Sequence, residues 1–289
     1  MARRQGPSPS DDSSSSGSDA SSSSDNEHIQ PPSTRPAKKP KTVTAAPLSV
    51  SANLSQTLQQ QHSTSSSSSI THPIIVILDQ ASLETVKNKR GVYELLNCDD
   101  HRDVCKKQLK KDPNIFRPDI LHQELLALLD APLNKAGLLK IYIQTTKHVL
   151  IDVHPSIRIP RTYKRFAGLF VQLLHKMKIK AQNESKTLLK VIKNPVSQYL
   201  PAGTRAYGLS SQGTLYRPMA LARELLTFDN PQQAPHATCF VIGAMSTGHV
   251  RMDDYPFIEQ MISVSEYPLS GAAAIARLLG AMEERWGVV

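Results

Sequence analysis

Residues 239–248 read Cys-Phe-Val-Ile-Gly-Ala-Met-Ser-Thr-Gly, an apolar run that breaks at a loop bounded by two glycines. Residues 261–270 read Met-Ile-Ser-Val-Ser-Glu-Tyr-Pro-Leu-Ser, a second short run that breaks and then leads into a helical pattern. Both runs have the length and composition of buried strands. Two successive strand ends with exposed main chain favour a nucleotide-like ligand that is held largely by backbone groups.

Other segments extend this pattern toward the N-terminus. We predict further strands at residues 74–78, 138–144, 148–153 and 188–192, and helices at 119–130, 164–178, 219–226 and 270–285. Ser270 is the expected N-cap of the last helix. Strands that alternate with helices predict an α/β domain with a mostly parallel sheet, here spanning residues 72–289.

The first 70 residues are different in kind. Residues 9–25 consist almost only of Ser, Asp, Gly and Ala, so we expect residues 1–70 to be a disordered Ser-rich tail. Within it, residues 35–41 (Arg-Pro-Ala-Lys-Lys-Pro-Lys) resemble a short nuclear-import signal. The acidic site at Ser24 could be read by a kinase, and the alternative is a tail that only solubilises the chain.

Positive charge is concentrated in one part of the sequence. The formal net charge is +9, and between Pro155 and Pro195 ten Lys or Arg residues face a single acid, Glu184. Such a basic band is typical of a nucleic-acid partner, and a merely solvated basic face is the alternative.

Several classes of protein are disfavoured. The three cysteines, Cys98, Cys105 and Cys239, show neither metal-ligand spacing nor a disulfide framework, so we expect no metal and a reducing compartment. No apolar run is long enough to span a membrane.

Six motifs in register carry a resemblance that covers residues 72–289. They are Arg117-Pro-Asp-Ile120, residues 158–166 (Arg-Ile-Pro-Arg-Thr-Tyr-Lys-Arg-Phe), residues 171–176, residues 189–195, Gly243-Ala-Met245 and Tyr267-Pro-Leu-Ser270. The chain thereby resembles the pseudouridine-N1-specific methyltransferases of small-subunit ribosomal RNA, a family of the SPOUT superfamily.

The resemblance implies a SPOUT-type α/β domain with a C-terminal trefoil knot, an exception to the usual absence of knots. It also implies a homodimer, S-adenosylmethionine as cofactor, small-subunit rRNA as substrate, and a nucleolar location. Small-subunit pre-ribosome assembly factors are the implied protein partners.

The resemblance assigns the cofactor to the two loops that opened this section. Its residues are Leu209, Gly243, Gly248, His249, Val250, Val264, Ser265, Glu266, Tyr267, Pro268 and Leu269. Glycines there permit close approach of the backbone, and the apolar side chains offer walls. Without the resemblance, two ordinary turns after buried strands would be the favoured reading. Glu266 stands where the family usually has Asn, and a carboxylate cannot donate hydrogen bonds as an amide can.

For RNA contact the resemblance assigns Arg117, Arg158, Arg161 and Arg165. Arginine pairs with phosphate in a bidentate manner and stacks on bases, which suits a nucleotide flipped out of a loop. Cations are not favoured at the positive end of a helix, so arginines before and at the start of the helix at 164–178 indicate a negative neighbour.

No catalytic residue is certain from the sequence. Asp119 has two open roles, proton acceptor or a group that orients Arg117, and the second is favoured. His175 is interpreted as structural, and His154 is left open. The chemistry itself needs alignment of the pseudouridine N1 with the methyl group rather than a nucleophile, so we expect direct transfer. The competing hypothesis is a non-catalytic rRNA-binding assembly factor, motivated by Glu266.

Overall fold

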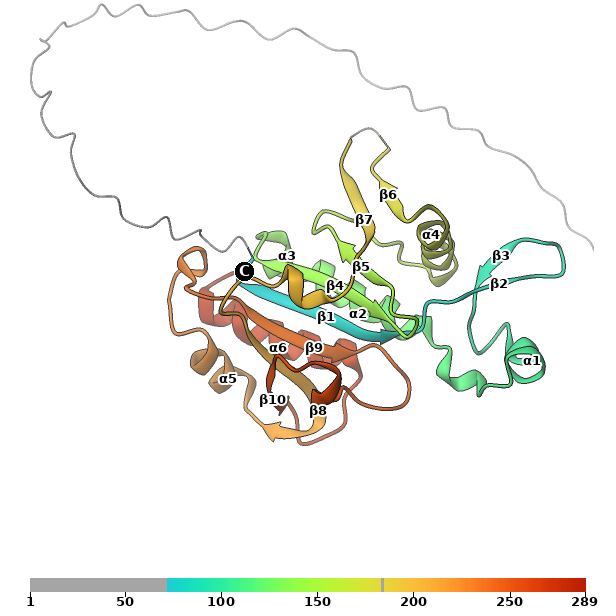
Figure 1. Cartoon of the computed structure of the whole chain (residues 1–289). Coiled ribbons are helices and arrows are strands. Elements are labelled where there is room, and N and C mark those ends of the chain that lie inside the picture. The colour runs from blue at the N-terminus through green and yellow to red at the C-terminus, as the bar shows by residue number, and fades with distance from the viewer. Residues whose placement is uncertain (1–71, 183–184) are drawn as a thin grey trace, which may run out of the picture. The chain divides into compact units, whose positions relative to one another are not determined.

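The computed structural model describes residues 72–182 and 185–289, and these contain one eight-stranded sheet with helices against it (Figure 1). The predicted tail, import signal and kinase site lie outside the described residues. The strands of the sheet are β1 (Ile74–Ala81), β4 (Leu139–Thr145), β5 (Leu150–Val153), β6 (Lys178–Lys180), β7 (Thr187–Ile192), β8 (Arg205–Leu215), β9 (Thr238–Gly243) and β10 (Ile258–Ser263).

The sheet has a parallel half and an antiparallel half. Its strand order is β10-β8-β9-β1-β4-β5-β7-β6. The five strands from β10 to β4 run parallel, whereas β5, β7 and β6 pair in antiparallel fashion. β1 is central and buried on both faces, as its continuous apolar sequence predicts. The expected α/β class with a mostly parallel sheet is confirmed, and the trefoil knot stays a prediction.

The long helices cover one face of the sheet. They are α2 (Pro118–Asp130), α4 (Tyr163–Lys176), α5 (Pro218–Leu225) and α6 (Gly271–Trp286), with the short α3 (Pro132–Lys135) between α2 and β4. Ile74, Val76 and Leu78 of β1 pack among these helices, whereas Ile75 and Ile77 face a second core on the other side. α2 and α6 lie side by side behind the sheet (Figure 1).

Helix ends follow local chemistry. Ser270 Oγ accepts a hydrogen bond from the Ala273 N–H at 3.3 Å, so the predicted N-cap of α6 is confirmed. The helix predicted at 164–178 ends at Lys176, which corrects our boundary. Met177 takes a left-handed conformation (φ 60°) and donates its N–H to the Leu173 carbonyl oxygen. The chain then turns directly into β6.

Two further parts of the fold were missed, and one predicted strand has different bounds. β8 lies within the sheet yet contains Gly208, Ser210 and Ser211, so it lacks the apolar run that identifies a buried strand. The short hairpin of β2 (Thr85–Lys87) and β3 (Tyr93–Leu95), followed by α1 (Arg102–Val104), forms an excursion between β1 and α2. The apolar run predicted at residues 261–265 belongs to β10, which begins at Ile258 and ends at Ser263.

Candidate cofactor cavity and basic surface

A cavity of about 490 Å³ lies between the loops that follow β9 and β10 on one side and the starts of α2 and α6 on the other. β8 contributes its central residues to the same wall. Parallel sheets commonly bind ligands beyond the carboxyl ends of their strands, where the connecting loops leave backbone groups free. The volume lies within the range of about 300–1,000 Å³ that small-molecule sites occupy.

Ten of the eleven predicted cofactor residues line this cavity. They are Leu209, Gly243, Gly248, His249, Val250, Val264, Ser265, Tyr267, Pro268 and Leu269. Glu266 does not line the cavity, and it is exposed to solvent. The position at which this chain departs from the resembling family therefore presents its side chain elsewhere.

Local bonds hold the two loops in shape. Gly248 has φ +98°, a conformation that residues with a Cβ rarely adopt. The Ser246 hydroxyl donates to the Asn114 carbonyl oxygen at 2.6 Å and ties the first loop to the segment before α2. In the second loop, the Tyr267 N–H donates to Ser265 Oγ at 3.1 Å. Contacts within the chain thus help to shape both loop walls.

The opposite wall was not predicted from the sequence. It is lined by Arg117, the N-cap residue of α2, and by three residues of the helix: Ile120, Gln123 and Glu124. Glu124 is 0% exposed, and neither of its carboxyl oxygens has a hydrogen-bond partner among the described residues. Burial raises its pKa to about 8. The available signal was an acid inside the apolar stripe of a helix, between Leu121 and Leu128.

Arg117 and Asp119 form a bidentate ion pair at the start of α2. Arg117 donates through Nε to Asp119 Oδ1 at 2.8 Å and through Nη2 to Oδ2 at 2.6 Å. These bonds lower the pKa of Asp119 and raise that of Arg117. An ionised carboxylate whose two oxygens are already engaged is poorly suited to accept a proton, so the geometry favours orientation of Arg117.

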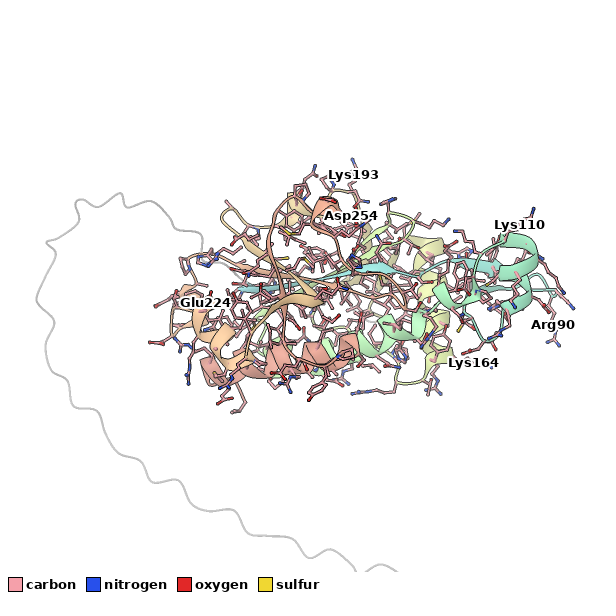
Figure 2. All side chains as sticks on the ribbon, turned by 90° about the horizontal axis from the view of Figure 1, so that it is seen from below. Arg90, Lys110, Lys164, Lys193, Glu224 and Asp254 are labelled. Carbon is pink, nitrogen blue, oxygen red and sulfur yellow. The ribbon has the colours of Figure 1, made fainter. Side chains whose placement is uncertain are left out.

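The other predicted RNA-binding arginines lie on what we call the α4 basic surface: Arg158, Arg161, Lys164 and Arg165, all exposed. Figure 2 shows Lys164 projecting outward from α4. Arg161 pairs with Asp130 at 2.6 and 3.1 Å, which supplies the negative neighbour expected for this cluster. Arg158 and Arg165 make no ion pair with any described residue. The first turn of α4 carries no acid, so this surface keeps its positive charge.

α2 joins the cavity to the α4 basic surface. Its residues 117, 120, 123 and 124 face the cavity. His122 lies on a different side, with Nε2 2.7 Å from the Pro160 carbonyl oxygen and its ring stacked on Phe166 at 4.4 Å. Asp130, at the end of the same helix, holds Arg161. One helix therefore positions both regions.

The two histidines make local contacts. His175 Nδ1 lies 2.8 Å from the Val171 carbonyl oxygen, and its ring packs edge-on against Tyr93 at 4.5 Å, in keeping with a structural role. His154 Nδ1 lies 3.0 Å from both the backbone nitrogen and the hydroxyl of Ser156. Neither histidine lines the cavity.

The described residues contain no cluster of three or more His, Cys, Asp or Glu side chains that could hold a metal ion. Their three cysteines are free. None of the described helices has the length and apolar character needed to cross a bilayer.

Comparison with known proteins gives a consistent result. Residues 76–283 match the family model described as EMG1/NEP1 methyltransferase. The chain is 48% identical over 216 residues to the human ribosomal RNA small subunit methyltransferase NEP1, covering 75% of this chain and 83% of the human protein. It is 45% identical over 218 residues to the Drosophila melanogaster protein of the same name, covering 75% and 83% of the two chains.

A solved structure shares the fold. The crystal structure of Archaeoglobus fulgidus Nep1 bound to S-adenosylhomocysteine superposes with a TM-score of 0.59 at 22% sequence identity. The match covers 74% of this chain and 98% of the archaeal one.

Proposed function

The chain belongs to the EMG1/NEP1 methyltransferase family, and from that premise we propose that it transfers a methyl group from S-adenosylmethionine to the RNA of the small ribosomal subunit. The observation that carries the proposal is the cavity itself. Two loops chosen from the sequence for their exposed main chain form one wall of a single site of suitable volume. The names of the relatives and the ligand of the archaeal neighbour support the same activity.

The residues of the cavity fit this cofactor. Apolar side chains of Leu209, Val264 and Leu269 can enclose a flat ring, while backbone N–H and C=O groups of the two loops can hydrogen-bond the ring's polar edge. Arg117 and Gln123 add polar groups on the α2 side. When bound, the sulfonium of the cofactor supplies an electrophilic methyl group, so neither a metal nor a protein nucleophile is needed.

We propose N1 of a pseudouridine as the acceptor. The transfer would form the N1–carbon bond and break the carbon–sulfur bond, with the electron pair going to sulfur and the N1 proton to solvent. The chain's part is to align the two atoms and exclude water, and positioning of this kind can contribute several kcal/mol. Arg117, fixed by Asp119 at the cavity wall, is suited to hold the target nucleotide.

RNA binding is assigned to Arg117 together with the α4 basic surface. Its exposed guanidinium groups can pair with phosphates and stack on unpaired bases of a loop. A base that is already unpaired enters the cavity at low unstacking cost.

We further propose a homodimer that works in the nucleolus with small-subunit pre-ribosome assembly factors. Tyr267 is 73% exposed and Leu269 is 40% exposed at the cavity rim, and a second copy of the chain would cover such apolar surface. Light scattering coupled to size exclusion should give twice the chain mass. A fluorescent fusion should co-localise with a nucleolar marker.

The activity is tested by mass spectrometry of rRNA from cells depleted of this protein. We expect one N1-methylated pseudouridine of the small-subunit rRNA to lose its methyl group and to regain it when the wild-type chain is restored. Unchanged methylation at every such position would refute the proposal.

A non-catalytic assembly factor remains the second candidate, and the observation behind it is Glu266. Calorimetric titration of the folded protein with S-adenosylmethionine and S-adenosylhomocysteine separates the two functions. Binding of both ligands supports the enzyme. No binding, combined with retained rRNA binding, supports the assembly factor.

A further inference from the structure

Glu124 is an unexplained buried acid at the edge of the cavity. Its side chain is 0% exposed, and both carboxyl oxygens lack a hydrogen-bond partner among the described residues. A buried polar group left unpaired costs about 1–3 kcal/mol, and more if it is charged. Such a group in a folded protein calls for an explanation, and a functional role is one of the explanations that apply.

The carboxyl group of Glu124 packs against the start of α6. Gly271, the first residue of α6, has no side chain, and a Cβ built there would overlap Glu124 Oε1. Both residues line the cavity. The carboxyl group therefore lies where the start of α6 meets the ligand space, and a side chain at 271 would displace it.

Within residues 72–182 and 185–289, no cation forms an ion pair with Glu124. Burial is what raises its pKa, and Arg117 on the same helix is already engaged by Asp119. Across the cavity the titratable side chains are His249 and Tyr267. The elements packed against α2 carry these further charged or titratable groups: Asp79 of β1, Lys135 of α3, Tyr163, Lys164, Arg165, His175 and Lys176 of α4, and Arg277, Glu283, Glu284 and Arg285 of α6.

We propose that Glu124 recognises the positive charge of the methyl donor. The donor carries two cationic groups, a sulfonium and an α-ammonium. Either could pair with the Glu124 carboxylate, which has no such partner among the described residues. This assignment rests on the proposed function and deepens it, because it names a side chain that selects the ligand by charge. The neighbouring loops, by contrast, offer mostly backbone and apolar groups.

A charge-selective role has a consequence for turnover. Methyl transfer converts the sulfonium into a neutral thioether. If Glu124 pairs with the sulfonium, the product leaves the buried carboxylate without a partner and is released more readily. If it pairs with the α-ammonium, donor and product are held equally.

The test is calorimetric titration of the full chain and of Glu124→Gln with three ligands: S-adenosylmethionine, S-adenosylhomocysteine and 5′-methylthioadenosine, which carries neither cationic group. We expect Glu124→Gln to bind S-adenosylmethionine about tenfold more weakly at about pH 8.5, since a hydrogen-bonded charge pair is lost. Binding of 5′-methylthioadenosine should not change. A loss confined to S-adenosylmethionine identifies the sulfonium, and an equal loss for S-adenosylhomocysteine identifies the α-ammonium.

Repeating the titrations at about pH 6.5 adds a second readout, because the acid must then give up its proton to bind a cation. Wild-type affinity for S-adenosylmethionine should rise with pH, whereas Glu124→Gln, which mimics the protonated acid, should show no such rise. Glu284→Gln, an exposed acid on α6, is the matched control and should behave as wild type. Thermal unfolding of each variant verifies that it folds.

Two results would overturn the assignment. One is an equal loss of affinity for 5′-methylthioadenosine, which would mean that Glu124 acts through cavity shape. The other is unchanged affinity of Glu124→Gln for S-adenosylmethionine at both pH values. If the wild-type protein bound neither S-adenosylmethionine nor S-adenosylhomocysteine, the proposed function itself would fail, and Glu124 would fail with it.

Discussion

The cavity and the α4 basic surface differ in the sign, number and burial of their charged side chains. In the cavity a single acid, Glu124, is fully buried and has no hydrogen-bond partner in the part of the chain that the structure describes. On the α4 basic surface four cations lie exposed in water, and one of them, Arg161, already has an acidic partner. A buried charge interacts strongly with one correctly placed group. Exposed charges each interact weakly with a partner, so several of them are needed for a strong effect.

The difference indicates a division of labour. The cavity is suited to distinguish small ligands that differ by one charge, and the α4 basic surface is suited to hold a polyanion. Substitutions in the cavity should therefore change cofactor affinity and leave rRNA binding unchanged, and substitutions on the α4 basic surface should do the reverse.

The largest effect should come from filling the cavity. Gly271→Leu places a side chain in the ligand space and displaces Glu124, so we expect S-adenosylmethionine affinity to fall by at least about 100-fold in calorimetry. Binding to a small-subunit rRNA transcript should be retained. Gly280→Leu is the control, because a Cβ at that position of α6 meets no atom within 4 Å. Equal losses in both variants would show that α6 itself, rather than the cavity, is disturbed.

Next in size is the pH dependence of stability. The folded-state pKa of Glu124 is about 8 and the ordinary value is 4.5, so the folded state keeps a proton that the unfolded chain releases. Stability without ligand should therefore fall as pH rises from about 4.5 to 8, by about 2 kcal/mol between pH 6 and pH 8 from this group alone. The free energy of unfolding, measured by urea denaturation at several pH values, should fall with rising pH more steeply for wild type than for Glu124→Gln. The same pH dependence in both proteins would mean that Glu124 is not protonated in the folded protein.

A smaller effect is expected on the α4 basic surface. The double change Arg158→Ala and Arg161→Ala should weaken rRNA binding by about tenfold and reduce its salt dependence by about two phosphate contacts in filter-binding assays. Cofactor affinity should stay near wild type. Arg223→Ala with Arg277→Ala removes the same charge from the exposed sides of α5 and α6 and should change rRNA binding less. Collapse of cofactor affinity in the first variant would refute the separation of the two regions.

The smallest effect is expected at Glu266. Because this side chain is exposed and does not line the cavity, Glu266→Asn should change S-adenosylmethionine affinity by less than about twofold. A larger gain would show that the side chain turns toward the ligand on binding. That outcome would also strengthen the argument for a non-catalytic assembly factor.

Much of the fold was predictable from local patterns. β1 is a continuous apolar run, and the core positions Phe166, Phe170 and Leu173 of α4 follow helical spacing. β8 was not predictable, because its buried segment is short and its remainder is polar and rich in glycine. Its place in the sheet depends on pairing with β9 and β10, which no local pattern contains.

One wall of the cavity was likewise predictable from local sequence and the other was not. The loop wall was predictable from broken strands and the resemblance, since its character is local to residues 243–250 and 264–269. The α2 wall was not, because an acid in a helix normally lies in solvent and only the tertiary fold buries Glu124. The pair of Arg161 with Asp130 likewise joins residues 31 positions apart in the chain.

The length of α2 fixes the distance between the cavity and the α4 basic surface. The helix contacts the cavity near Arg117 and the α4 basic surface at Asp130, a span of about 20 Å at the rise of an α-helix. One inserted or deleted residue within it would rotate everything beyond by about 100° and swing Glu124 or Asp130 away from its place. The helix should therefore tolerate substitutions at many positions but no change of length, and under the proposed function its length would set the distance from RNA on the α4 basic surface to the base in the cavity.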